Sequence, residues 1–127
     1  MEWIIRDDGF KKENIEFFGS KYLIGNGYMG YRGTLEEYGS RQLCACTLAG
    51  IYDKNGDGWR EPVNMPNPFY VCVKVNGEAL SVLERQPMRH VQELDMHTGR
   101  FIRNTEYDTS AGRCTIHGFC RISDAIL

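Results

Sequence analysis

The chain has 127 residues, of which 42% are hydrophobic and 25% charged, and its formal net charge at pH 7 is −2. This length is enough for one globular domain, and the composition argues against a disordered chain. The balanced charge argues against a nucleic-acid-binding protein, and no apolar run reaches the roughly 18 residues of a membrane helix. We also expect no secretory signal, because Glu2 follows the first residue and no apolar segment comes after it.

Short runs of β-branched, aromatic and cysteine residues alternate with glycines along the whole chain, a pattern typical of all-β domains. Strands are predicted, in chain order, near residues 3–6, 22–24, 42–52, 69–76, 79–84, 89–94, 100–107 and 113–123. The helical pattern is weak, since residues 34–37 fit a capping box but Gly39 ends it after about one turn. Three prolines predict an extended loop over residues 61–68.

Hairpin turns are predicted at Asn76-Gly77, Thr98-Gly99 and Ala111-Gly112, each between two predicted strands. Strands joined in this way predict an antiparallel β-sandwich.

Residues 25–30 read G-x-G-x-x-G, which in dinucleotide-binding proteins forms a turn that leads into a helix. No helical pattern follows here, so we interpret the glycines as a bend between strands. Residues 53–58 match the first half of a calcium loop, but Asn64 occupies the position of the bidentate carboxylate and Pro62 lies inside the loop. We therefore predict a polar loop tip and no metal site.

Five cysteines without a Cys-x-x-Cys pair predict reduced thiols and a cytoplasmic location. Cys44 and Cys46 are predicted to share one strand face, and Cys114 and Cys120 another, as small buried side chains. Adjacent carboxylates at Glu36 and Glu37 are predicted to point in different directions as solvated turn residues.

Aromatic residues are frequent in the predicted loops, where an exposed ring can stack on a sugar or contact another domain. Trp59 lies between polar and glycine residues and is predicted to be exposed. Together with Tyr52, it is a candidate contact for a sugar or a partner domain.

Five segments in a fixed order resemble glycoside hydrolase family 65. Residues 25–33, followed by Glu36-Glu37, resemble its signature GNGYxGxRG…EE, and residues 49–53 resemble AG-x-Y/F-D. Residues 63–67 resemble LVN-x-PN, residues 94–103 resemble LDM-x-x-G-x-x-x-R, and residues 121–123 resemble R-x-S. The signature residues are Gly25, Asn26, Gly27, Tyr28, Gly30, Arg32, Gly33, Glu36, Glu37, Asn64, Pro66, Leu94, Asp95, Met96, Gly99 and Arg103.

The resemblance is to the N-terminal domain of this family, which implies a galactose mutarotase-like β-supersandwich over residues 1–127. We expect the sandwich to be incomplete at its C-terminal end and the catalytic (α/α)6 barrel to be absent. The four signature glycines, Gly25 to Gly33, would shape a bend that Tyr28 and Arg32 fix by packing and hydrogen bonding.

The family includes maltose, kojibiose, nigerose and trehalose phosphorylases and related α-glucoside hydrolases. The resemblance thus implies a parent enzyme that cleaves an α-glucosidic disaccharide, either with inorganic phosphate and inversion, to give β-glucose 1-phosphate, or by hydrolysis. It implies no catalytic residue and no cofactor in this chain, a barrel in the same polypeptide as partner, and a homo-oligomer. Two alternatives remain open: a free-standing carbohydrate-binding module, and a structural or oligomerisation domain with open strand edges.

Overall fold

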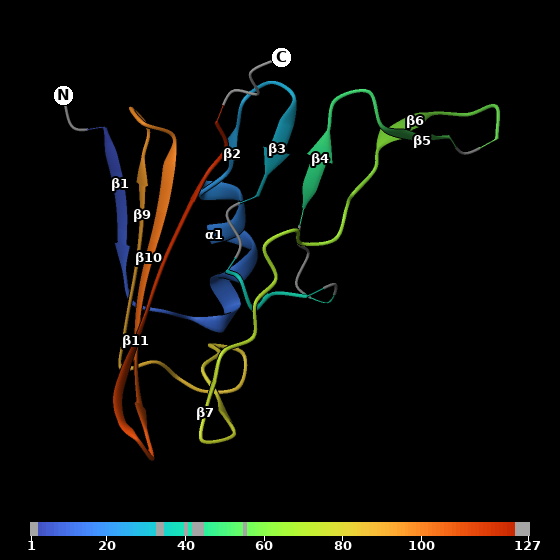
Figure 1. Ribbon diagram of the computed structural model, residues 1–127. Helices are drawn as coiled ribbons and strands as arrows, with labels where there is room; N and C mark the ends of the chain where they lie inside the picture. Colours follow the sequence, from blue (N-terminus) through green and yellow to red (C-terminus); the bar gives the residue numbers. More distant parts are fainter. Residues whose placement is uncertain (1–2, 33–34, 40, 42–44, 55, 124–127) are drawn as a thin grey trace.

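The computed structural model describes residues 3–32, 35–39, 41, 45–54 and 56–123. Within them the elements are β1 (Ile4–Asp8), η1 (Lys12–Asn14), α1 (Ile15–Lys21), β2 (Ile24–Gly25), β3 (Met29–Tyr31), β4 (Cys46–Leu48), β5 (Tyr52–Lys54), β6 (Arg60–Pro62), β7 (Lys74–Val75), β8 (Glu78–Ala79), β9 (Arg89–Asp95), β10 (Arg100–Thr109) and β11 (Gly112–Arg121). All strand pairs are antiparallel. The predicted all-β antiparallel class is confirmed (Figure 1).

The largest sheet has the strand order β1-β9-β10-β11. Successive side chains of a strand point to opposite faces, so residues 101, 103, 105 and 107 of β10 share the buried face. The strands predicted at 3–6, 89–94, 100–107 and 113–123 are all present in this sheet. The three predicted turns are also confirmed. Asn76 and Gly77 both have positive φ, and Gly99 and Gly112 lie at the turns that join β9 to β10 and β10 to β11.

The second layer consists of α1 and the sheet β2-β3-β4, which face the buried side of the large sheet (Figure 1). Buried residues from both layers form one hydrophobic cluster: Phe10, Tyr22, Ile24, Tyr31, Leu35, Tyr38, Cys46, Leu80, Val82, Leu94, Phe101 and Tyr107. The main contribution to stability is the removal of this apolar surface from water. The predicted two-layer arrangement of antiparallel strands is therefore present.

Helix α1 is the main element that the sequence pattern missed. Ile15, Phe18 and Tyr22 recur at spacings of three and four, and they turn toward the core, with Tyr22 fully buried. Asp7 of β1 holds the helix end by accepting hydrogen bonds from the Tyr22 hydroxyl and from the Lys21 ammonium group, the latter at 2.5 Å. The predicted strand at residues 22–24 is wrong at Tyr22, which ends the helix, and pairing begins only at Ile24.

Two further strand predictions are mostly wrong. Of residues 69–76 only Lys74–Val75 pairs, because the backbone of Val71 donates to the carbonyl of Glu36 instead of to a neighbouring strand. Residues 80–84 do not continue as a strand after β8, and residues 82–84 form a turn, although Leu80 and Val82 are buried. The long strand predicted at 42–52 is interrupted between β4 and β5, and residues 42–44 lie outside the described ranges.

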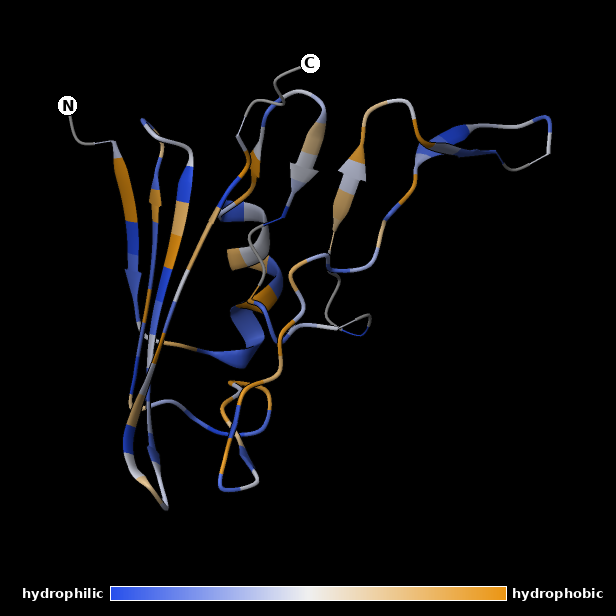
Figure 2. Ribbon diagram, viewed as in Figure 1, coloured by the Kyte–Doolittle hydropathy of each residue, from blue (hydrophilic) through white to orange (hydrophobic). Residues whose placement is uncertain are grey.

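The hairpin β5–β6 extends away from the two layers, and all six of its strand residues are exposed (Figure 1). Both of its strands have mostly hydrophilic residues (Figure 2), whereas the buried apolar residues belong to the core cluster. No helix among the described residues is long and apolar enough to cross a membrane.

Candidate functional site

The first signature segment forms the turn between β2 and β3. Asn26 Oδ1 accepts hydrogen bonds from the backbone N–H groups of Tyr28 (3.0 Å) and Met29 (2.8 Å). Gly27 has a φ of 84°, a conformation that favours glycine. The chain then continues as strand β3, so these glycines form a bend between strands, as predicted, and no helix follows to bind a phosphate.

Asn26 and Arg32 tie this bend to distant parts of the chain. The Asn26 amide donates to the carbonyl of Ser123, just beyond β11, at 2.9 Å. The Arg32 guanidinium donates to the carbonyl of Glu16 (2.6 Å) and to the hydroxyl of Ser20 (2.9 Å), both in α1. The expected role of Arg32 is therefore confirmed. The Tyr28 ring, however, is 58% exposed and does not pack in the core, and Gly33 lies outside the described residues.

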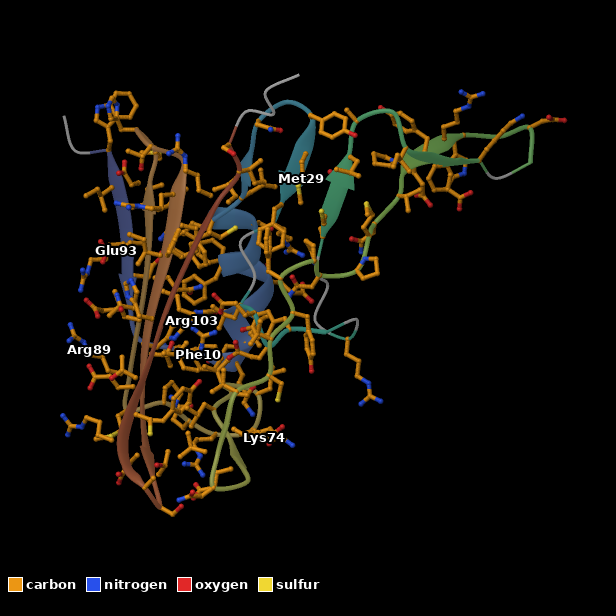
Figure 3. All side chains as sticks on the ribbon, in the orientation of Figure 1. Phe10, Met29, Lys74, Arg89, Glu93 and Arg103 are labelled. Atoms are coloured by element: carbon orange, nitrogen blue, oxygen red, sulfur yellow. The ribbon has the colours of Figure 1, made fainter. Side chains whose placement is uncertain are left out.

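A buried charge cluster joins Glu36 and Glu37 of the first signature segment to Arg103 of the segment at residues 94–103. Arg103 is 1% exposed and forms ion pairs with Glu36 (Nη1 to Oε2, 2.8 Å) and with both oxygens of Glu37, one of them at 3.1 Å. Burial alone would lower the pKa of Arg103, but the carboxylates of Glu37 and Glu36 outweigh it and raise the pKa. In Figure 3 the Arg103 side chain lies between the two layers of the fold.

The prediction for Glu36 and Glu37 is therefore wrong. The two side chains converge on one guanidinium, because residues 36 and 37 lie in a tight turn in which the backbone N–H of Tyr38 donates to the Leu35 carbonyl. The Glu37 side chain is only 8% exposed and also accepts the backbone N–H of Val82. Both carboxylates bind Arg103; Glu37 is largely removed from solvent, whereas the Glu36 side chain keeps 27% of its surface exposed.

A neutral histidine extends the cluster into the core. His90 is 2% exposed, and its Nδ1 lies 2.8 Å from the hydroxyl of Thr105, which itself accepts a hydrogen bond from Arg103 Nε at 3.0 Å. The Thr105 hydroxyl can donate to Nδ1 or accept from it, and the buried Nε2 atom has no hydrogen-bond partner among the described residues. Burial, and then the positive charge of Arg103, lower the pKa of His90 to about 4. The ring is therefore uncharged at neutral pH.

The segment at residues 94–103 supplies Arg103 and also builds the β9–β10 turn. Asp95 accepts hydrogen bonds from the backbone of His97 and Thr98 and from the Thr98 hydroxyl, at 2.7–3.2 Å. These bonds, those from Thr98 first, lower the pKa of Asp95. Leu94 is buried beside Phe101, whereas Met96 is 45% exposed.

Asn67, the last residue of the segment that resembles LVN-x-PN, has a structural role although it was not among the candidate residues. Its side-chain oxygen accepts the Tyr31 hydroxyl (3.1 Å) and the backbone N–H of Phe69 (3.0 Å), and its amide donates to the carbonyl of Tyr38 (3.0 Å). Asn64 and Pro66, which the signature singled out, are both exposed. The flanking prolines Pro66 and Pro68 were the available signal, because they fix the backbone on either side of Asn67.

A cavity of about 530 Å³ lies beside the charge cluster, between the end of β11 and the loop after Asn67. Aromatic residues dominate its wall, and the Tyr31 and Phe69 rings meet edge to face at 5.0 Å. Its lining residues are Tyr31, Glu36, Pro68, Phe69, Tyr70, Val71, Phe101, Phe119, Cys120 and Arg121.

The two predicted contact residues, Tyr52 and Trp59, are exposed by 56% and 61%. Tyr52 shares a second, shallower cavity of about 290 Å³ with Tyr28 and the signature glycines, whereas Trp59 does not line it. Sequence reasoning thus identified two exposed rings, but the structure brings together Tyr28 and Tyr52.

Metal-ligating residues do not gather in the described ranges: no group of three His, Cys, Asp or Glu side chains could hold an ion there. In the calcium-like segment, Asp53 accepts the backbone N–H of Lys54, Asp57 lies 3.6 Å from the Lys54 ammonium, and Asn55 is outside the description. The thiols of Cys46, Cys72, Cys114 and Cys120 are free. Cys46 is buried as predicted, whereas Cys114 and Cys120 are only partly buried. Cys44 also lies outside the described residues.

Comparison with known proteins identifies the family of this chain. Residues 5–123 match the model of glycosyl hydrolase family 65, N-terminal domain. The chain is 40% identical over 112 residues to the nigerose phosphorylase of Lachnoclostridium phytofermentans, covering 88% of this chain and 15% of that one. It is 33% identical over 123 residues to the kojibiose phosphorylase of Thermoanaerobacter brockii, covering 96% of this chain and 16% of that one.

The fold comparison is consistent with the sequence comparisons. A solved structure assigned as a kojibiose phosphorylase from human microbiome superposes with a TM-score of 0.80 at 20% identity, over 92% of this chain and 17% of that chain. The chain spans only 13–16% of the length of the curated phosphorylases it matches. The fold, the signature segments and residues 5–123 all match this family. The chain therefore belongs to glycosyl hydrolase family 65 and corresponds to its N-terminal domain.

Proposed function

We propose that this chain is the non-catalytic N-terminal β domain of a phosphorylase that cleaves an α-glucosidic disaccharide. The observation that carries the proposal is how the signature residues use their polar atoms. Asn26 and Asp95 bind turn backbone, and Glu37 and Arg103 bind each other inside the core. Groups engaged in this way stabilise a scaffold and leave none of these four residues free to react with a substrate.

The chemistry of the parent enzyme is proposed from the family. A catalytic (α/α)6 barrel in the same polypeptide would cleave the glucoside with inorganic phosphate as co-substrate, and residues 1–127 would form part of the sandwich that packs beside it. We favour the projecting hairpin β5–β6 as the contact with that barrel, because Tyr52 and Trp59 are exposed on it. Exposed rings of this kind are typical of interfaces.

A chimera tests this function. The aligned N-terminal segment of the Lachnoclostridium nigerose phosphorylase is replaced by this chain, and phosphate-dependent release of glucose 1-phosphate from nigerose is measured. We expect an active chimera, an inactive enzyme when the segment is deleted, and no activity of the isolated chain. Release of glucose 1-phosphate by the isolated chain from maltose, kojibiose, nigerose or trehalose would show that the proposal is wrong.

The barrel contact is tested in the same chimera by Tyr52→Ala combined with Trp59→Ala. Loss of both rings is expected to lower thermal stability of the joined domains, while the isolated chain unfolds unchanged. Glu61→Ala is the matched control, because Glu61 is exposed on the same hairpin without an aromatic ring.

Sugar binding is a second candidate function, favoured by the shallow cavity between Tyr28 and Tyr52. Two aromatic rings above a glycine floor could stack on a pyranose. Calorimetry with the four disaccharides at millimolar concentration tests it: heat that disappears in Tyr52→Ala supports a binding module, and absence of heat from the unchanged chain removes it.

A structural role in oligomerisation is the third candidate. Trp3 and Ile4, at the β1 edge of the large sheet, are exposed by 50% and 48%. We propose that this edge contributes to a homo-oligomer of the parent enzyme, and that the free thiols reflect a cytoplasmic location. Light scattering of the chain and of Ile4→Lys tests the proposed homo-oligomer. A strictly monomeric species at high concentration would count against it.

A further inference from the structure

The dipeptide Asn-Gly occurs three times in the sequence, at residues 26–27, 55–56 and 76–77. Asparagine followed by glycine is prone to deamidation, because glycine has no side chain to shield its backbone nitrogen from the asparagine amide carbon. Asn55 lies outside the described residues. Asn26 and Asn76 can be compared directly, since they share the reactive dipeptide and differ in their surroundings.

Asn26 is held by hydrogen bonds at both ends of its side-chain amide. Its Oδ1 accepts the backbone N–H groups of Tyr28 and Met29, and its Nδ2 donates to the carbonyl of Ser123 at 2.9 Å. The strands on either side, β2 and β3, belong to a three-stranded sheet with β4. The amide carbon of Asn26 can therefore turn toward the Gly27 nitrogen only after several bonds break.

Asn76 lies at the tip of the hairpin β7–β8 and has no such contacts. The residue is exposed, and its side chain makes no hydrogen bond with the described residues. Its φ of 49° is the only positive φ of a non-glycine residue in the described ranges, and Gly77 follows with a φ of 82°. Asn-Gly with two positive φ angles is typical of a type I′ hairpin turn. The turn alone thus determines the position of this asparagine.

The hairpin β7–β8 is short. Each strand has two residues, and neither pairs with another described strand. Two-stranded hairpins are marginally stable on their own, and elements of this kind open locally far more often than a packed core. When the turn opens, the Gly77 nitrogen can approach the amide carbon of Asn76, and no side-chain hydrogen bond of Asn76 has to break first.

We propose that Asn76 is a deamidation site of this chain and that the contacts of Asn26 protect Asn26 from the same reaction. The backbone nitrogen of Gly77 attacks Cγ of Asn76, a C–N bond forms, and the Cγ–Nδ2 bond breaks. The amide nitrogen leaves as ammonia with the proton that Gly77 loses, and a succinimide remains. Water then adds to one of the two ring carbonyls, and ring opening gives aspartate or isoaspartate. This modification goes beyond the proposed scaffold role and does not depend on the reaction of the parent enzyme.

The isoaspartate product would alter a hairpin that is tied to the large sheet. Glu78 accepts the backbone N–H of Ser110, in the β10–β11 turn, at 3.1 Å, and it also forms an ion pair with Arg85. Isoaspartate adds one methylene to the main chain inside the turn, so the two-residue turn no longer matches the pairing of Val75 with Glu78. We expect the Glu78–Ser110 contact to weaken in this product.

The test uses the 127-residue chain, kept folded in warm, mildly alkaline buffer. Peptide mapping by mass spectrometry follows the conversion of each asparagine, and hydroxylamine, which cleaves the chain at a succinimide, traps the intermediate. We expect Asn76 to convert on the order of tenfold faster than Asn26. The same chain unfolded in guanidinium chloride is the matched control, because unfolding removes the contacts of both residues. There the two rates should become similar.

The variant Asn76→Gln supplies a second arm. Glutamine would have to close a larger ring, so conversion at residue 76 should be lost while the slow conversion of Asn26 is unchanged. NMR of the separated isoaspartate product tests the tie to the large sheet. The amide resonance of Ser110 should shift, whereas that of Thr98, in the β9–β10 turn, should not.

Three results would overturn the proposal. They are equal conversion of Asn26 and Asn76 in the folded chain, no conversion of Asn76 in the folded chain when the unfolded chain converts, and a rate difference that persists in the unfolded chain. The last result would assign the difference to neighbouring residues in the sequence instead of to the fold. An unchanged Ser110 resonance would contradict the weakened contact with Glu78. The rates in the unchanged chain decide the matter even if Asn76→Gln disturbs the hairpin.

Discussion

Arg103 of β10 and Gly118 of β11 are direct register partners, and the glycine makes the buried charge cluster possible. A Cβ atom on residue 118 would collide with Oε1 of Glu36, whose carboxylate lies over the glycine on its way to the Arg103 guanidinium. Gly118 lies outside the signature segments, yet it gives the signature carboxylate its place. The space left by the missing side chain at residue 118 is thus occupied by the Glu36 carboxylate of the ion-pair cluster.

Gly118→Ala is expected to displace Glu36 and lower the free energy of unfolding by about 1–2 kcal/mol, since the carboxylate is flexible enough to move aside at the cost of its ion pair. Urea unfolding measures the change. In a Glu36→Ala background the same glycine substitution should cost much less, because the colliding carboxylate is gone. An equal cost in both backgrounds would mean that Gly118 acts through the backbone instead.

Arg103→Met is expected to destabilise the chain by about 3–5 kcal/mol, because it leaves the Glu37 carboxylate buried without a cation. Arg103→Lys should recover only part of this loss, since an ammonium group cannot bind two carboxylates and Thr105 in the geometry of a guanidinium. Thermal and urea unfolding measure both variants. Combining Arg103→Met with Glu37→Gln should restore some stability, and a strictly additive double variant would contradict the buried pair.

His90 predicts how stability depends on pH. Its folded-state pKa is about 4, whereas an unfolded histidine titrates near 6.5. Between these values the unfolded state binds the proton and the folded state does not, so acid favours unfolding. The contribution is fully present above about pH 6.5 and is lost as the pH falls toward 4, at up to about 1.4 kcal/mol per pH unit.

Urea unfolding from pH 7 to pH 4 measures this dependence, and carboxylates add to it mainly at the acid end. His90→Gln should flatten the part of the curve between pH 6.5 and 5. His97→Gln is the matched control, because His97 is exposed in the β9–β10 turn. If both variants kept the slope of the unchanged chain, His90 would not be its source.

The sequence predicted the strands of the ladder β9–β10–β11 because short runs rich in β-branched, aromatic and cysteine residues lie between glycine-containing turns. It did not predict α1, because a helix of seven residues that contains Gly19 is too short to give a sustained helical pattern. Residues 71–73 alternate like a strand, but their backbone bonds go to loop partners such as the carbonyl of Glu36. Local pattern therefore indicated the strand, and tertiary contacts decided against it.

In the candidate site, too, the sequence pattern did not indicate which distant residues are in contact. Family resemblance named Glu37 and Arg103 separately, 66 residues apart, and nothing in the spacing indicates that they form an ion pair. Exposure was easier to predict, since the polar and glycine neighbours of Trp59 indicated a surface loop. Partnerships between distant polar residues depend on the complete fold, which is why the charge cluster emerged only from the structure.

Asn67→Ala is expected to lower the free energy of unfolding by about 1–3 kcal/mol, and Asn64→Ala by no more than about 0.5 kcal/mol. The difference arises because the Asn67 side chain forms hydrogen bonds with Tyr31, Tyr38 and Phe69, whereas Asn64 is exposed in the same motif. Loss of Asn67 should also loosen the loop that forms one wall of the larger cavity, and amide exchange of residues 69–71 measures this directly. Equal stability of the two variants would show that Asn67 does not hold the loop, since the substitutions differ only in position.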